Sequence, residues 1–187
     1  MSLKAPDHPI VAFDSDYVLP QQIHYNVNED LVISDEFQNI IYTSQCELNK
    51  ITVRNGKEGN VVFNVKFNEM IRPIEKFTIY LGSTDTTEIA TVKLKPSFLS
   101  KKYIIDFVNK TSNNREELIL KCNTAFSTCE IYSGNKKFGA PLICKMRQIF
   151  VIKFDFDIAP NVDRLFMLAI AEVFFKLNKI NTQVGSW

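Results

Sequence analysis

Basic side chains recur at alternate positions in two segments that have the pattern of β-strands. Lys93 and Lys95 lie in one segment, and Lys145 and Arg147 lie in the other. Alternate residues of a strand point to the same face, so each pair could offer two cations to one phosphate group. With a further pair after the loop at 96–99, the candidate headgroup-binding residues are Lys93, Lys95, Lys101, Lys102, Lys145 and Arg147. Lysine is also common at solvent-facing strand positions, so an ordinary solvated surface is the alternative.

The distribution of charge indicates a local basic surface rather than a basic protein. The formal net charge is +1, which argues against a dedicated nucleic-acid-binding protein. The first 36 residues contain one lysine and seven carboxylates, so the basic excess lies in the rest of the chain. The loop at 96–99 is apolar, and an apolar loop beside lysines is suited to contact with an anionic lipid surface.

The sequence offers little for catalysis. Its two histidines, His8 and His24, lie near the N-terminus and outside any ligand or nucleophile signature. Asp155 and Asp157 would share one strand face, as paired catalytic carboxylates can. A solvated strand exterior explains them better, because the residues that alternate with them are apolar. We therefore expect a protein without enzymatic activity, cofactor or metal.

The four cysteines do not have the spacing of a zinc site or a redox motif. Cys46, Cys122, Cys129 and Cys144 contain no C-x-x-C pair, so isolated buried thiols are expected. The N-terminal residues lack the pattern of a secretory signal, which favours a reducing, cytoplasmic location, with peripheral attachment to a membrane as a further expectation. Residues 185–187 resemble the start of an affinity tag and are excluded from the fold interpretation.

Short β-branched and aromatic runs separated by polar turns dominate the chain from Leu31 to Phe156, which is typical of an all-β domain. Strands are expected at 31–33, 40–42, 51–54, 61–67, 77–80, 89–94, 103–108, 118–121, 128–132, 142–146 and 150–156. The Asn55-Gly56 pair predicts a hairpin turn before 61–67. An echo at an offset of 52 positions indicates that 79–82 and 131–134 belong to two related hairpins.

A strongly apolar segment follows Pro160. From Val162 to Leu177 all but four residues are apolar, and Asn161 stands at the N-cap position with Asp163 in the first turn. A helix that is apolar on nearly every side is either enclosed by protein or inserted in a bilayer. At ~1.5 Å per residue this helix is shorter than the ~30 Å hydrocarbon core, which favours enclosure. Strands that enclose a helix must curl into a barrel.

The C-terminal third resembles the LURP-one-related family. The resemblance is carried by a hairpin at 129–134 and 144–147, then by a Pro-x-Val-Asp turn and a final apolar helix within 158–170. The segments 60–65 and 77–82 are similar to the family's preceding strand pairs. The resemblance implies the fold shared with the tubby C-terminal domain and phospholipid scramblases, a barrel of about twelve strands around a hydrophobic helix. The cysteine cluster and acidic loop of scramblases are missing, which argues against lipid translocation.

We therefore expect a mainly β protein, a closed antiparallel barrel of about twelve strands around a central hydrophobic C-terminal helix. The helix is expected at about 161–177, inside a tubby-like barrel domain that spans residues 31–180. Residues 1–30 are expected to form an acidic, partly ordered N-terminal segment.

Three functions are open. The first is a non-enzymatic cytosolic module that recognises anionic membrane lipid, with a phosphoinositide-like headgroup, through the basic strand-loop face. The resemblance supports it, because in tubby domains a basic strand pair and the adjoining loop bind phosphatidylinositol phosphates. The second is a protein-interaction adaptor that uses the acidic N-terminal segment or an exposed strand edge to bind a protein partner. The third and least favoured is a scramblase-like membrane protein with the final helix inserted; no nucleic-acid partner is expected.

Overall fold

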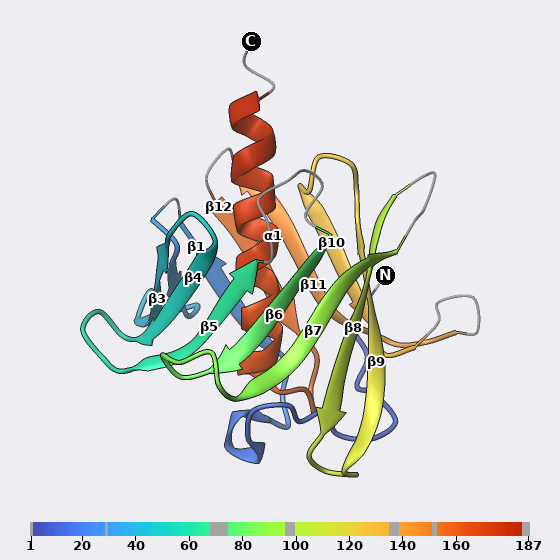
Figure 1. The fold of residues 1–187 in the computed structure, drawn as a ribbon. Helices are drawn as coiled ribbons and strands as arrows, with labels where there is room; N and C mark the ends of the chain where they lie inside the picture. The colour runs from blue at the N-terminus through green and yellow to red at the C-terminus, as the bar shows by residue number, and fades with distance from the viewer. Residues whose placement is uncertain are drawn as a thin grey trace.

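The computed structural model describes residues 2–28, 30–67, 75–95, 100–134, 139–150 and 153–184, with helix side chains described as far as Asn178. In these residues twelve strands form a closed antiparallel barrel, and one long helix, α1 (Arg164–Val184), runs through it (Figure 1). This confirms the predicted fold class. The predicted apolar loop at 96–99 and the segment 185–187 lie outside the described residues.

The strands follow one another around the ring, since each pairs with the next along the chain and β1 pairs with β12 to close it. They are β1 (Ile23–Val27), β2 (Val32–Ser34), β3 (Ile40–Cys46), β4 (Lys50–Asn55), β5 (Val61–Phe67), β6 (Lys76–Leu81), β7 (Glu88–Lys95), β8 (Lys101–Asn109), β9 (Asn114–Cys122), β10 (Thr128–Tyr132), β11 (Leu142–Phe150) and β12 (Lys153–Ile158). A short 3-10 helix, η1 (Ser15–Tyr17), precedes them.

Alternating burial explains why these segments curl around a core. In β8 the side chains of Tyr103, Ile105 and Phe107 are buried, and the residues between them face outward. The strand that the sequence pattern did not predict is β1. Its Tyr25 and Val27 are buried in the same way, and Ile23 of the same alternation is partly buried against the core. The polar residues around this short strand hide the pattern in the sequence.

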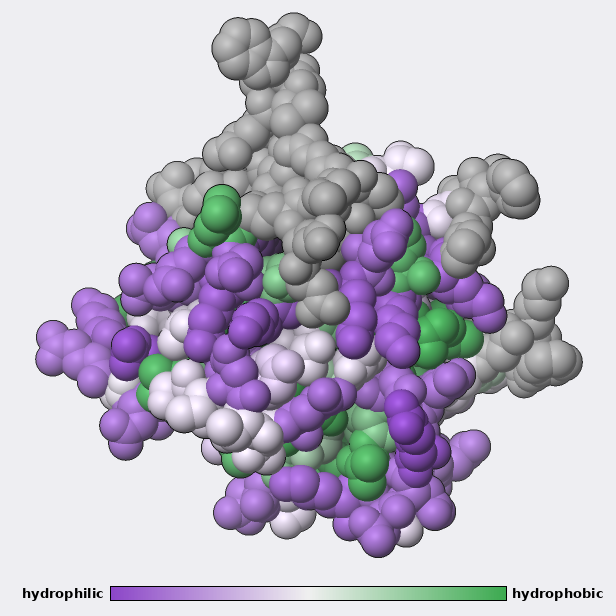
Figure 2. All heavy atoms as spheres, viewed as in Figure 1, coloured by the Kyte–Doolittle hydropathy of each residue, from purple (hydrophilic) through white to green (hydrophobic). Residues whose placement is uncertain are grey.

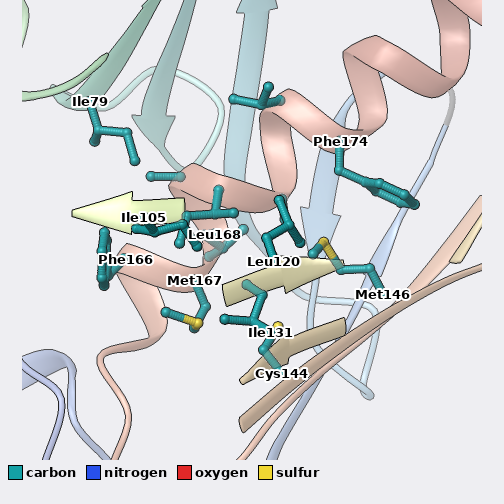
Figure 3. Packing of buried hydrophobic residues seen from close by; sticks show 14 of the residues in the cluster. Ile79, Ile105, Leu120, Ile131, Cys144, Met146, Phe166, Met167, Leu168 and Phe174 are labelled. Carbon is teal, nitrogen blue, oxygen red and sulfur yellow. The ribbon is translucent and has the colours of Figure 1, made fainter. Parts of the chain in front are cut away.

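The helix α1 forms the centre of the core. Every residue from 165 to 171 is fully buried, and so are Val173, Phe174 and Phe175. Figure 3 shows Phe166, Met167 and Leu168 among side chains that come from the surrounding strands. The helix is therefore enclosed by the barrel, as its all-round apolar sequence predicted.

The helix begins at Arg164 rather than at about 161, and its N-cap is Asp163. The Oδ1 atom of Asp163 accepts a hydrogen bond from the backbone N–H of Phe166 at 3.0 Å, which is the usual side-chain cap of a helix. Asn161 has φ 61°, the left-handed conformation of a tight turn. The predicted cap at Asn161 is therefore wrong, because this residue turns the chain between β12 and α1.

The segment before β1 closes the end of the barrel at which α1 begins. Ala12 and Phe13 are buried, and their backbone N–H groups donate to Oδ2 of Asp163 at 3.1 and 2.7 Å. Asn109 of β8 holds the same segment, because its side-chain amide donates to the carbonyl oxygen of Pro9 at 2.9 Å. Residues 10–13 are all buried and thus belong to the core of the molecule, and α1 leaves the barrel at the opposite end (Figure 1).

The hairpins β6–β7 and β10–β11 share an irregularity. The pairing shifts between Ile79 and Tyr80 in the first hairpin and between Ile131 and Tyr132 in the second. These positions lie at the same offset as the sequence echo. The structure therefore agrees with two hairpins of related design, each bent by a bulge next to its turn.

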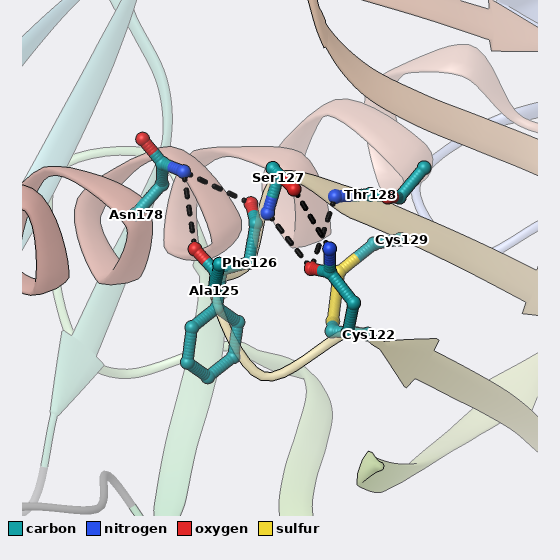
Figure 4. Close-up of a disulfide and its surroundings, with 8 residues drawn as sticks. Cys122, Ala125, Phe126, Ser127, Thr128, Cys129 and Asn178 are labelled. Atoms are coloured by element: carbon teal, nitrogen blue, oxygen red, sulfur yellow. Dashed lines mark hydrogen bonds between the residues drawn. A yellow bond between two sulfur atoms is a disulfide. The ribbon is translucent and has the colours of Figure 1, made fainter. Parts of the chain in front are cut away.

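Cys122 and Cys129 form a disulfide across the β9–β10 hairpin (Figure 4). The hairpin register places the two residues directly opposite each other. Cys144 is free and buried, whereas Cys46 is free and exposed. The prediction of isolated buried thiols is therefore wrong except for Cys144, because strand pairing, which sequence spacing does not show, brings Cys122 and Cys129 together.

Candidate functional site

Lysines of neighbouring strands line up on the outer surface of the barrel. Lys95 of β7 pairs with Lys102 of β8, and Lys102 pairs with Lys121 of β9. On the other side of β7, Lys93 pairs with Lys76 of β6. Directly opposed residues of antiparallel strands have Cβ atoms within ~5.5 Å of each other. We call the set Lys76, Lys93, Lys95, Lys102 and Lys121 the basic strip.

Lys101 adjoins the basic strip but differs from it in orientation. It shares the alternation of the buried residues Tyr103 and Ile105, and its register partner is the buried Cys122. Because it is the first residue of β8, it lies at the end of the barrel and is half-exposed. The structure thus places Lys93, Lys95 and Lys102 on the outer face of this hairpin, and Lys101 lies beside them at the end of the barrel.

Lys145 and Arg147 lie on β11 and are separated from the basic strip by β10. Glu130 of β10 stands between Lys121 and Lys145 in the same cross-strand row. Arg147 donates from Nη2 to Oδ2 of Asp155 at 2.8 Å, and this hydrogen bond raises the pKa of Arg147. The six predicted residues therefore do not form one continuous patch.

The two basic pairs also differ in register. Lys76 pairs with Lys93 in the first hairpin, and Thr128 pairs with Arg147 in the second. Lys76 and Thr128 are equivalent because they lie 52 positions apart, the offset of the echo. Their cross-strand partners, Lys93 and Arg147, therefore occupy equivalent places in the two hairpins, and no basic residue of the first hairpin is equivalent to Lys145. The pairs Lys93/Lys95 and Lys145/Arg147 are thus similar in residue type and in sequence offset, but they occupy different places in the register of their hairpins.

Among the described residues, no carboxylate forms an ion pair with Lys76, Lys93, Lys95 or Lys102 of the basic strip. Lys121 lies 5.4 Å from the ring centroid of Tyr132. The neighbouring carboxylate Asp106 is held by Arg115 through two contacts of 2.6 Å. The hydrogen bond from Arg115 lowers the pKa of Asp106, with a smaller contribution from Lys93.

The side chains of Asp155 and Asp157 point outward, and each has a polar partner on a neighbouring strand. Asp155 binds Arg147, and Oδ1 of Asp157 lies 2.8 Å from Nδ1 of His24. This arrangement agrees with the solvated strand exterior expected for the two carboxylates. Among the residues that the structure describes, no group of histidine, cysteine and acidic side chains could hold a metal ion.

Two open grooves mark the outer surface. One, of about 450 Å³, runs between β2 and the β11–β12 hairpin, and its walls include the exposed Ile40, Ile149 and Phe150. The other, of about 460 Å³, adjoins the first residue of α1 and is lined by Tyr25 and Arg164. The face seen in Figure 2 is mainly hydrophilic, with scattered hydrophobic residues.

Sequence reasoning missed Lys76 and Lys121. Each is an isolated basic residue within its own strand, so neither forms the alternating pair that drew attention to 93–95. They join the basic strip only through cross-strand pairing with Lys93 and Lys102. The sequence gives one indication of them: Lys76 directly precedes the predicted strand 77–80 and Lys121 ends the predicted strand 118–121, and these two strands flank the hairpin at 89–108.

None of the helices in the described residues combines the length and the apolar character needed to span a bilayer. The closed barrel threaded by an apolar helix is consistent with the tubby-like class of proteins. The family model of LURP-one-related proteins matches residues 16–175, and the chain belongs to this family. The match begins before β1 and ends inside α1, so it includes every strand of the barrel. A search of curated proteins found no match.

Proposed function

We propose that this protein is a non-enzymatic binding module that docks on anionic membrane lipid through the basic strip. The alignment of lysines across four neighbouring strands, β6 to β9, supports the proposal. A lysine near an anionic bilayer surface contributes about 1 kcal/mol of binding free energy. The basic strip is therefore sufficient for reversible attachment of a cytoplasmic protein to the membrane surface.

A headgroup with several phosphates, such as that of a phosphoinositide, suits the basic strip best. Lys95, Lys102 and Lys121 follow one another across three strands, so their ammonium groups can reach neighbouring phosphates. Each such contact is a charge-assisted hydrogen bond. Arg147 has a smaller part in this proposal because its guanidinium is already bound to Asp155.

Co-sedimentation with vesicles tests the proposal. The vesicles contain phosphatidylcholine with phosphatidylserine and phosphatidylinositol bisphosphate. The variant Lys93→Glu/Lys95→Glu/Lys102→Glu should bind about 100-fold more weakly than the wild type, since three contributions of about 1 kcal/mol are lost and repulsion is added.

The control is Arg54→Glu/Lys57→Glu, which reverses two charges at exposed positions on β4 and in the turn after it, outside the strands that carry the basic strip. It should keep most of the affinity. Equal retention of the wild type and the strip variant would overturn the proposal. Retention on phosphatidylserine alone, without a gain from the bisphosphate lipid, would overturn the preference for a phosphoinositide.

The adaptor hypothesis stays a prediction. The closed ring leaves no unpaired edge among the described strands, so an adaptor would depend on exposed acidic residues such as Asp7 and Asp14. The scramblase-like hypothesis receives no support, because the helix that it would insert is enclosed by the barrel. Failure of the wild type to bind any anionic vesicle would favour the adaptor.

A further inference from the structure

The end of the barrel from which α1 emerges has an even arrangement of hairpins. The closed strand order sets the β3–β4, β7–β8 and β11–β12 hairpins four strands apart around the ring. The described strand ends next to these three connections lie at the end where the helix leaves, and so do those next to the β1–β2, β5–β6 and β9–β10 connections (Figure 1). We call this end the exit rim. The last turns of α1 project past these hairpins (Figure 1), so a surface that touches the hairpins also meets the end of the helix.

Two of these hairpins expose large apolar side chains at the exit rim. Leu48, in the β3–β4 turn, is 77% exposed, and Phe150, at the end of β11, is 69% exposed. Ile149 is exposed beside Phe150, and both line the groove of about 450 Å³. This groove extends from them toward Ile40 at the start of β3. Apolar side chains that water surrounds on two separate hairpins are suited to entry into a lipid surface.

The third hairpin supplies positive charge. Lys95 ends β7, and Lys101 and Lys102 begin β8. Lys153 adds a further exposed cation next to Phe150, at the start of β12. The described carboxylates near this end include Asp30, Glu47, Glu75 and Asp85, and Asp85 is paired with Lys50 and Lys66. Lysines beside exposed apolar groups match the two layers of a membrane surface, which are anionic headgroups above acyl chains.

The β3–β4 turn that carries Leu48 is braced by the central helix. The Lys176 ammonium, almost completely buried, donates to the carbonyl oxygens of Glu47 at 2.8 Å and Leu48 at 3.1 Å. Asn178 donates in the same way to the carbonyl oxygens of Ala125 and Phe126 in the β9–β10 turn (Figure 4). A turn fixed in this way loses little conformational freedom when it contacts another surface.

We infer that the exit rim is the face that meets the bilayer, with Leu48 and Phe150 entering the acyl boundary. Lys95, Lys101, Lys102 and Lys153 contact the headgroups around them. The inference depends on the proposed lipid binding and adds the orientation of the barrel. The barrel axis is close to perpendicular to the membrane plane, with the exit rim toward the bilayer.

Fluorescence from single tryptophans tests this orientation. In a Trp187→Phe background, Leu48→Trp and Phe150→Trp place the probe on the exit rim. Phe37→Trp is the matched control, because Phe37 is as exposed as Leu48 but lies in the β2–β3 turn at the opposite end, next to Asp35 and Glu36. With vesicles of the same anionic composition and brominated acyl chains, probes 48 and 150 should be quenched and probe 37 should not.

A second measurement uses polar variants at the same exposed positions. Leu48→Ser/Phe150→Ser should lower vesicle affinity about tenfold, because apolar surface no longer leaves water. Phe37→Ser should change it little. Circular dichroism should show the same fold in all variants.

Stronger quenching at 37 than at 48 and 150, or vesicle-bound protein without quenching at 48 and 150, would overturn the orientation and leave lipid binding intact. Absence of vesicle binding by the wild type would overturn both proposals. An unchanged affinity of the Leu48→Ser/Phe150→Ser variant would also contradict the entry of these residues.

Discussion

At the scale of single residues, the least expected group is a carboxyl inside the barrel. Glu172 of α1 is completely buried, and its Oε1 accepts a hydrogen bond from the hydroxyl of Ser44 at 2.7 Å. Its Oε2 has no hydrogen-bond partner among the described residues. Burial raises the pKa of Glu172 to about 8, because the charged form loses its hydration without gaining a cation. The side chain is therefore protonated at neutral pH.

This pKa predicts how stability depends on pH. The folded state binds a proton that the unfolded state releases above its pKa of 4.5, so the free energy of unfolding should fall between pH 4.5 and about 8. The slope from this group approaches about 1.4 kcal/mol per pH unit. Glu172→Gln should remove this part of the slope and be more stable than the wild type at pH 8. Urea unfolding at several pH values measures it, and parallel curves for the two proteins would contradict it.

At the scale of elements, one carboxylate joins the start of α1 to the N-terminal segment. Asp163 accepts hydrogen bonds from the backbone N–H groups of Ala12, Phe13 and Phe166. Burial raises its pKa, and these donors oppose the increase. The same side chain thus caps the central helix and holds the segment that covers this end of the barrel.

Loss of this carboxylate should be costly. Asp163→Ala removes a helix cap, worth about 1 kcal/mol, and leaves buried N–H groups without acceptors, at about 1–3 kcal/mol. We expect a total of about 2–4 kcal/mol in the free energy of unfolding, measured with urea. Asp14→Ala is the control, because Asp14 caps the exposed η1 and should matter little. Similar losses in the two variants would show that Asp163 is only a local cap.

At the scale of the whole molecule, charge is divided along the barrel axis. The lysines of the basic strip and exit rim lie toward the end where α1 emerges, whereas many carboxylates lie at the other end. These carboxylates include Asp14, Asp16, Asp35, Glu36, Glu58, Glu88, Glu116 and Glu117, and they outnumber the cations of that end, which include Arg54, Lys57, Lys110, Arg115 and Arg164. Such a separation orients the molecule before contact, since the acidic end is repelled by an anionic surface.

Salt should therefore weaken vesicle binding without abolishing it. Between about 0.1 and 0.5 M sodium chloride the Debye length shortens from about 10 to 4 Å, so affinity should fall at least several-fold. The remaining affinity comes from the apolar contacts of Leu48 and Phe150. The Leu48→Ser/Phe150→Ser variant should therefore lose its remaining affinity for vesicles at high salt. Co-sedimentation across a salt series measures this, and a salt-independent affinity would contradict it.

Much of the fold could be predicted from local pattern. Short β-branched and aromatic runs between polar turns identified every strand except β1, and the almost unbroken apolar run favoured α1 as a helix surrounded by protein. Both patterns depend on side chains within a few positions of each other. The N-cap was misplaced because Asn161 and Asp163 are both good caps by residue type. Only the backbone turn at Asn161 separates them.

The site was predictable only in part. The sequence by itself determined that basic residues alternate on predicted strands and that the final helix is apolar on nearly every side, which favoured its enclosure by protein. The tertiary structure decided that Lys76 and Lys121 join Lys93, Lys95 and Lys102, that Arg147 is bound to Asp155, and that Cys122 meets Cys129. The reason is physical: alternation is a property of one strand, whereas neighbours across a sheet are set by register, which depends on how the whole ring packs around α1.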